Sequence, residues 1–205
     1  MKKILVTLTI LLFTSSIYAQ ISNLINFNSG GMISVQWDMS MPISPMSDFV
    51  KNTSFTGFNI DYRHCYQHNI ILGGRVGWNH FYENRMQVIK DVNNTITISH
   101  IKHTLNAMPI LLVADYMVRS EKFIPYAGIG IGGYYIGSVI SQDNVTTESN
   151  NSFHFGVSPE IGITIPSILS NFGFNMSTRY NYALGTKKAS SYSWFNFSIG
   201  FSFMY

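Results

Sequence analysis

The chain has 205 residues and a formal net charge of +3 at pH 7; 11% of its residues are charged and 15% are aromatic. Water-soluble domains average about 25% charged residues, so this composition predicts a surface that largely contacts something other than water. The nearly neutral charge offers no electrostatic basis for binding nucleic acid, and we expect no nucleic-acid partner.

The first 19 residues have the three-part layout of a secretory signal peptide. Lys2 and Lys3 precede a mostly apolar run over residues 4–13, and a polar stretch then leads to Ala19. The apolar run is too short to span a bilayer as a helix. We therefore expect a cleaved signal peptide over residues 1–19 and one exported domain over residues 20–205.

The exported part contains no apolar run that approaches the ~20 residues of a transmembrane helix. A closed β-barrel is the other structure that satisfies every backbone N–H and C=O group inside hydrocarbon. The predicted fold class is therefore all-β, an eight-stranded antiparallel up-and-down transmembrane β-barrel.

Eight segments carry the alternation that this fold requires, with apolar side chains toward lipid and small or polar ones toward the lumen. Six are clear, over residues 33–41, 55–64, 70–82, 153–165, 172–181 and 195–205. The fourth, residues 105–116, is apolar on both faces, and Thr104 and Asn106 indicate its inward face. In the fifth, residues 127–135, we expect the glycines at even positions to face inward.

The predicted connections alternate between short and long, as outer-membrane barrels require. The short ones are residues 65–69, 118–122 and 166–171, and the long ones are residues 42–53, 83–99, 141–151 and 183–193. An even strand count places both termini on the same, periplasmic side.

Strand alternation continues on both sides of Asn93 and Asn94, which predicts a hairpin beyond the membrane; a mobile polar loop is the alternative. An exposed hairpin edge could recruit a protein partner by strand addition.

The tryptophans fall near the ends of the long connections. Trp37 and Trp78 have outward parity, where outer-membrane lipid would meet a girdle of aromatic side chains. Trp194 lies at a similar level but has inward parity. We therefore expect Trp37 and Trp78 to belong to the aromatic girdle.

These residues resemble the small eight-stranded outer-membrane barrels, including the OmpA transmembrane domain and the OmpX-like and OmpW-like proteins. Residues 109–116 followed by 125–130 look like the central hairpin of that superfamily. Phe201, Phe203 and Tyr205 resemble the signal that the barrel assembly machinery reads, with Tyr in place of the commoner terminal Phe. The junction at residues 18–20 also looks like the porin family or PorT-like barrels of Bacteroidota. The resemblance implies a location in the outer membrane.

Inward positions in the clear segments collect three acids and three bases: Asp38, Asp61, Arg63, Arg75, Glu160 and Arg179. An eight-stranded barrel is only wide enough for its own side chains to fill, and unpaired charges there would be costly. We therefore expect a lumen salt-bridge network that plugs the barrel. The register through the short turns predicts diagonal Asp61–Arg75 and Glu160–Arg179 pairs.

Several groups of residues invite a chemical role and have simpler explanations. The spacing of Gly128, Gly130 and Gly133 fits a dinucleotide fingerprint, but no helix follows them. His154 and Ser158 point inward, at the wrong spacing for acyl hydrolysis in lipid. The cluster of His64, Cys65 and His68, or the pair at positions 100 and 103, could bind a soft metal only if a third ligand folded in, and such groups are usually incidental. We expect no catalytic residue, no metal and no cofactor.

The leading hypothesis is therefore a non-enzymatic scaffold that is structural or presents an interaction surface, with a plugged lumen and its long connections outside the cell. One alternative is a narrow porin-like channel for small or hydrophobic solutes, which would need a looser plug. Another is an accessory component of a secretion system, PorT-like, whose turns or barrel wall contact other proteins.

Overall fold

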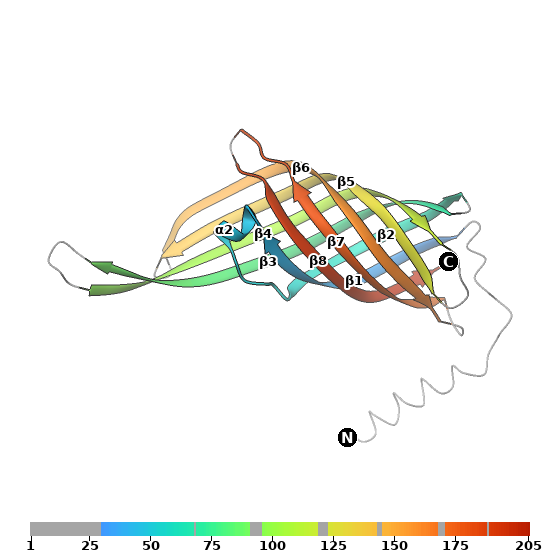
Figure 1. Ribbon diagram of the computed structural model, residues 1–205, viewed down its shortest axis with the longest axis horizontal. Helices are drawn as coiled ribbons and strands as arrows, with labels where there is room; N and C mark the ends of the chain where they lie inside the picture. Colours follow the sequence, from blue (N-terminus) through green and yellow to red (C-terminus); the bar gives the residue numbers. More distant parts are fainter. Residues whose placement is uncertain are drawn as a thin grey trace, which may run out of the picture.

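A computed structural model describes residues 30–67, 69–90, 96–118, 123–142, 145–167, 171–187 and 189–205. Within them, eight antiparallel strands follow one another around a closed barrel (Figure 1), which confirms the predicted fold class. The strands are β1 (Gly31–Ile43), β2 (Thr56–Gln67), β3 (Ile70–Lys90), β4 (Ile96–Met117), β5 (Ile124–Gln142), β6 (Val145–Pro166), β7 (Phe172–Ala183) and β8 (Tyr192–Met204). The predicted signal peptide, residues 1–19, lies outside the described residues.

The ring closes where β1 pairs with β8, from Met32 opposite Met204 to Ile43 opposite Ser193. The chain leaves β8 at the end that carries the short β2–β3, β4–β5 and β6–β7 connections, which we call the terminal end. The β3–β4 and β5–β6 hairpins extend from the opposite end, which we call the hairpin end (Figure 1). No helix among the described residues is long and apolar enough to cross a membrane.

The strands at the hairpin end are longer than the sequence pattern predicts. The pairing of β3 with β4 continues to Lys90 opposite Ile96, which confirms the predicted hairpin in residues 83–99. The expected long loop at residues 141–151 is wrong, because β5 and β6 pair as far as Gln142 opposite Val145. Residues 145–151 of β6 are exposed on both faces, so no inward face imposes the alternation by which a strand is recognised.

The outer surface of the barrel is apolar over every strand. Outward side chains such as Leu112, Phe155 and Phe201 are 71%, 69% and 68% exposed. The outward parity expected in β5 is confirmed, because Ile129 and Ile131 are exposed between glycines that face inward.

The inward face of β4 is opposite to the one predicted. Leu105, Ala107, Leu111 and Val113 are buried in the lumen. Asn106 has the opposite parity, and its Oδ1 lies 2.8 Å from Nδ1 of His80 on the outer face. The prediction failed because this part of the lumen is itself apolar, so polarity does not separate the two faces of β4.

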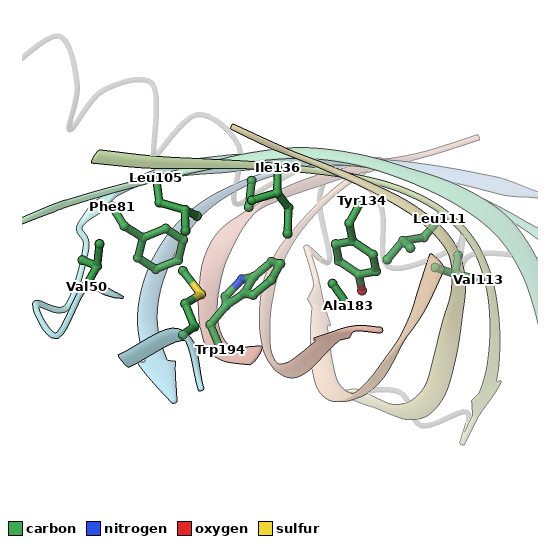
Figure 2. Close-up of a cluster of buried hydrophobic side chains, with 11 residues drawn as sticks. Val50, Phe81, Leu105, Leu111, Val113, Tyr134, Ile136, Ala183 and Trp194 are labelled. Carbon is green, nitrogen blue, oxygen red and sulfur yellow. The ribbon is translucent and has the colours of Figure 1, made fainter. Parts of the chain in front are cut away.

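The lumen is filled by three layers of side chains. An apolar layer at the terminal end consists of Met32, Ile71, Met117, Ile124, Tyr126 and Met204. A charged and polar layer follows, described below. A second apolar layer closes the hairpin end and contains Phe81, Leu105, Tyr134, Ile136 and Trp194 (Figure 2), with Met46 and Val50 from the β1–β2 connection.

Candidate functional site

Arg63 of β2 is at the centre of the charged layer. Its Nη1 lies 2.9 Å from Asp61 Oδ2 and its Nε lies 2.7 Å from Asp115 Oδ2, while Nη2 pairs with Glu160 of β6. Its guanidinium also lies 4.9 Å from the centroid of the Tyr126 ring. These contacts connect β2 to β4, β5 and β6 across the lumen, which is possible only because the barrel is narrow.

Arg75 of β3 pairs with two of the same carboxylates. Its Nε lies 2.5 Å from Asp61 Oδ1, and its Nη2 lies 2.6 Å from Glu160 Oε2. Asp61 and Arg75 are directly opposite each other in the β2–β3 register, and so are Glu160 and Arg179 in the β6–β7 register. The predicted partners therefore meet, but the predicted diagonal geometry is wrong. In both strand pairs the observed register differs from the one assumed.

Arg179 of β7 extends the layer to β1 and β8. Its Nη2 lies 2.7 Å from Asp38 Oδ1 and 2.5 Å from Ser198 Oγ, and its Nη1 lies 3.8 Å from Glu160 Oε2. Asn59 and Asn196 donate side-chain hydrogen bonds to the Asp38 carboxylate at 2.7 and 3.0 Å. All six predicted lumen residues thus lie in one network in the barrel interior.

Asp115 is a seventh member of this network that the sequence pattern missed. It lies near the end of β4, and its buried carboxylate accepts from Arg63. With Asp115 the network contains four carboxylates and three guanidinium groups. A consistent odd-position parity through β4 would have placed Asp115 in the lumen, but Thr104 and Asn106 indicated the even positions.

Neutral polar side chains continue the layer toward the terminal end. Gln36 donates to Asn175 at 2.6 Å, and Asn175 in turn donates to Thr164 at 2.8 Å. Ser34 and Ser202 share a hydrogen bond of 2.7 Å between β1 and β8. Such partners stabilise buried polar groups that would otherwise cost free energy in the folded state.

Trp194 dominates the apolar layer at the hairpin end (Figure 2). Its side chain is fully buried, and its ring lies edge-on to Phe81 and Tyr134, with centroid separations of 6.1 and 5.6 Å. The inward parity noted for Trp194 is therefore what the structure shows. The hydroxyl of Tyr134 donates to the carbonyl of Val157 at 3.2 Å.

The one-turn helix α2 (Met46–Phe49) lies in the β1–β2 connection at the hairpin end (Figure 1). Met46 and Val50 are buried against the apolar layer, and Phe49 packs at its edge. The sequence pattern predicts only a loop in this connection, because four helical residues are too few to show a period.

The outward aromatic residues occupy both ends of the barrel. Trp37 is 44% exposed and donates from Nε1 to the Phe55 carbonyl at 2.8 Å. The Trp78 ring stacks on the His80 ring, with 5.7 Å between the ring centroids. At the terminal end, the outward side chains of Tyr62, Tyr66, Tyr116 and Tyr205 are exposed. The sequence analysis did not assign the first three of these tyrosines to the aromatic girdle.

The C-terminal aromatic residues all face outward. Phe201 and Phe203 are exposed on β8. The ring centroid of Phe201 lies 6.0 Å from that of Phe174 on β7, and the centroid of Phe203 lies 5.2 Å from that of Phe172. Tyr205 follows β8, and its backbone pairs with that of Gly31.

The residues that could have suggested acyl hydrolysis or metal binding are held apart or have other partners in the structure. His154 is buried, with Nε2 at 2.7 Å from Ser152 Oγ and Nδ1 at 2.7 Å from the Leu184 carbonyl. Ser158 instead donates to Asn181 at 3.2 Å. His64 and Cys65 have opposite parity in β2, outward and inward. His68 lies outside the described residues.

Comparison with solved structures finds the same architecture. Neisserial surface protein A has a TM-score of 0.55 at 12% identity, covering 84% of this chain and 96% of that one. The Yersinia pestis attachment invasion locus protein Ail, in complex with the heparin analogue sucrose octasulfate, has 0.52 at 13%, covering 87% and 99%. The N-terminal β-barrel domain of Pseudomonas aeruginosa OprF has 0.50 at 13%, covering 87% and 98%.

The fold is thus that of the small eight-stranded outer-membrane β-barrels, the architecture that the sequence resemblance predicted. At 12–13% identity the likeness concerns the fold alone. No protein-family model matches the chain, and no curated protein matches it.

Proposed function

We propose that this chain is an outer-membrane barrel that acts as a structural or surface-interaction scaffold with a plugged lumen. The supporting observation is the continuous filling of the lumen, in which the Arg63 and Arg75 network lies between two apolar layers. A narrow channel for small or hydrophobic solutes would need a path through all three layers.

In this proposal the barrel lies in the outer membrane in one orientation. Residues 1–19 direct export and are removed, the apolar outer surface contacts outer-membrane lipid, and the termini face the periplasm. Trp37 and Trp78 then lie toward the outer leaflet, and Tyr62, Tyr66 and Tyr116 toward the inner one, where aromatic side chains favour the interface. The barrel assembly machinery recognises Phe201, Phe203 and Tyr205 before the chain inserts into the membrane.

The surface for interaction is the four-stranded sheet in which β3 to β6 continue beyond their neighbours. On the β3 side, the β1–β2 connection covers the edge: Asn52 donates to the Tyr82 carbonyl at 3.4 Å and Ser54 donates to the His80 carbonyl. On the β6 side, pairing with β7 ends at Gly156 opposite Ala183. The proposed partner is an extended polypeptide segment that adds to β6 outside the cell.

Conductance in planar lipid bilayers tests the plug. The refolded barrel is expected to show no steady openings, in bilayers where a general diffusion porin conducts under the same conditions. Sustained openings of the wild-type protein would show that the lumen is not sealed.

Photo-crosslinking in intact outer membranes tests the interaction surface. A photoreactive side chain at Asn151, on the outer part of β6, is expected to form protein adducts, and one at Leu112 on the lipid face is the matched control. Equal yields at the two positions, or none at Asn151, would contradict a partner at this edge.

A further inference from the structure

The β1–β2 connection covers the apolar layer at the hairpin end of the barrel. Met46 and Val50 are 1% and 0% exposed, and they belong to the same apolar cluster as Phe81, Leu105 and Trp194 of the barrel wall (Figure 2). These two side chains come from a segment that is not part of the ring of strands. The barrel wall would remain paired without them.

Polar contacts attach the same segment to β3. The Lys51 amide donates to Glu83 Oε2 at 2.5 Å, and Arg85 donates from Nη2 to the Phe49 carbonyl at 3.3 Å and to the Asp48 carbonyl at 3.4 Å. Glu83 and Arg85 also pair with each other, with 2.7 Å between Nε and Oε1. We call the Glu83–Arg85 pair and these three hydrogen bonds the clamp.

The clamp and the apolar contacts differ in their access to water. The Arg85 side chain is 36% exposed, so ions in solution can screen its pairing with Glu83. The buried side chains beneath it are shielded from salt. The segment is also joined to the wall at its two ends, where Ser193 donates to the Ser44 carbonyl at 2.8 Å and Ser54 pairs with Ser40.

We infer that residues 44–54 form a removable cap, hinged at Ser44 and at the contacts of Asn52 and Ser54 with β3, which the clamp holds over the apolar layer. Release of the clamp lets the cap swing away while the barrel wall and the charged layer stay in place. The cap thus controls access from outside to the side chains beneath it, independently of the salt-bridge network deeper in the lumen.

Thiol accessibility in the folded barrel tests this inference. In a Cys65→Ser background, Ala107→Cys places a single thiol in the apolar layer beneath the cap, and Leu105→Cys is the substitute if Ala107→Cys does not fold. The probe is a quaternary-ammonium methanethiosulfonate, which carries a permanent charge and does not cross lipid. Adding Glu83→Ala and Arg85→Ala is expected to raise the labelling rate about tenfold, because hydrogen bonds to charged groups are lost.

Three controls separate cap opening from general loosening. Met117→Cys places the thiol in the apolar layer at the terminal end instead, and it is expected to react at an unchanged rate when the clamp is removed. Lys187→Ala removes an exposed charge in the β7–β8 connection and should leave Ala107→Cys labelling unchanged. High salt should speed labelling with the clamp intact and have no further effect without it. Equal labelling of Ala107→Cys with and without the clamp, or equal acceleration at Met117, would overturn the inference.

Discussion

Arg63 and Asp115 form an ion pair between β2 and β4, with 2.7 Å between Nε and Oδ2, across the intervening strand β3. Arg63 also pairs with the carboxylates of Asp61 and Glu160, whereas Asp115 has no second ion pair within the described part of the chain. The two residues therefore depend on each other unequally, and this inequality can be measured.

We predict that Arg63→Met lowers the free energy of unfolding by about 3–5 kcal/mol, because it leaves a buried carboxylate unpaired. Asp115→Asn should cost less, since Arg63 keeps its pairs with Asp61 and Glu160. Urea titration of the barrel in lipid vesicles, followed by tryptophan fluorescence, provides the measurement. The double variant should be more stable than Arg63→Met alone; additive losses would contradict the pairing.

Gly73 and Gly74 provide a matched pair of backbone positions on β3. A Cβ atom at Gly73 would overlap the carbonyl oxygen of Tyr62 on β2, whereas at Gly74 the nearest atom, the Leu111 carbonyl oxygen, is 3.7 Å away. Gly73→Ala is therefore expected to destabilise the barrel by about 1–3 kcal/mol through overpacking, and Gly74→Ala should have little effect. The same urea titration compares them, and equal losses would argue against this close approach.

Trp194 and Trp37 differ in what surrounds them. Trp194 is fully buried between Phe81 and Tyr134, while Trp37 is 44% exposed on the outer face. Trp194→Ala should cost about 3–5 kcal/mol, the usual range for deleting a large buried aromatic side chain, and Trp37→Ala clearly less. Refolding yield and urea midpoints in vesicles measure both, and a larger loss at Trp37 would contradict the packed layer.

The predictability of each strand from sequence depended on what fills the lumen beside it. Ser34 and Gln36 reveal the inward face of β1 because the lumen there is polar. In β4 the lumen side carries Leu105 and Val113, so both faces are apolar and Asp115 was assigned no role. The charge pairs were foreseen because an isolated ion is costly in so narrow a barrel.

The cap and the paired extension of β5 and β6 beyond the barrel were not predicted, for a different reason. The burial of Met46 and Val50 results from contacts with strands far away in sequence, and no local period announces it. Residues 145–151 have water on both faces, so their side chains have no reason to alternate although the backbone is paired. In both cases the local sequence pattern carries no signal of the structure that forms.

The open edge of β6 predicts an alternating pattern of amide exchange. The Leu184 amide donates to the Phe155 carbonyl, so Phe155 directs its backbone polar groups toward β7. In an antiparallel pair the N–H and C=O of one residue point to the same side, and successive residues alternate. Phe153, Asn151 and Ser149 therefore point their amides to the β7 side, beyond the end of the β7 ladder at Ala183.

The amides of Ser149, Asn151 and Phe153 should exchange with deuterium faster than those of Asn150, Ser152 and His154, which face β5. Two-dimensional NMR of the barrel in lipid nanodiscs, recorded after transfer to deuterated buffer, resolves residues one at a time. The stretch stops at Ser149 because the register shift beside Ile140 opposite Glu148 reverses the alternation. Uniform protection from Ser149 to His154 would mean that another segment already covers this edge, and the proposed docking of a partner strand there would have to be abandoned.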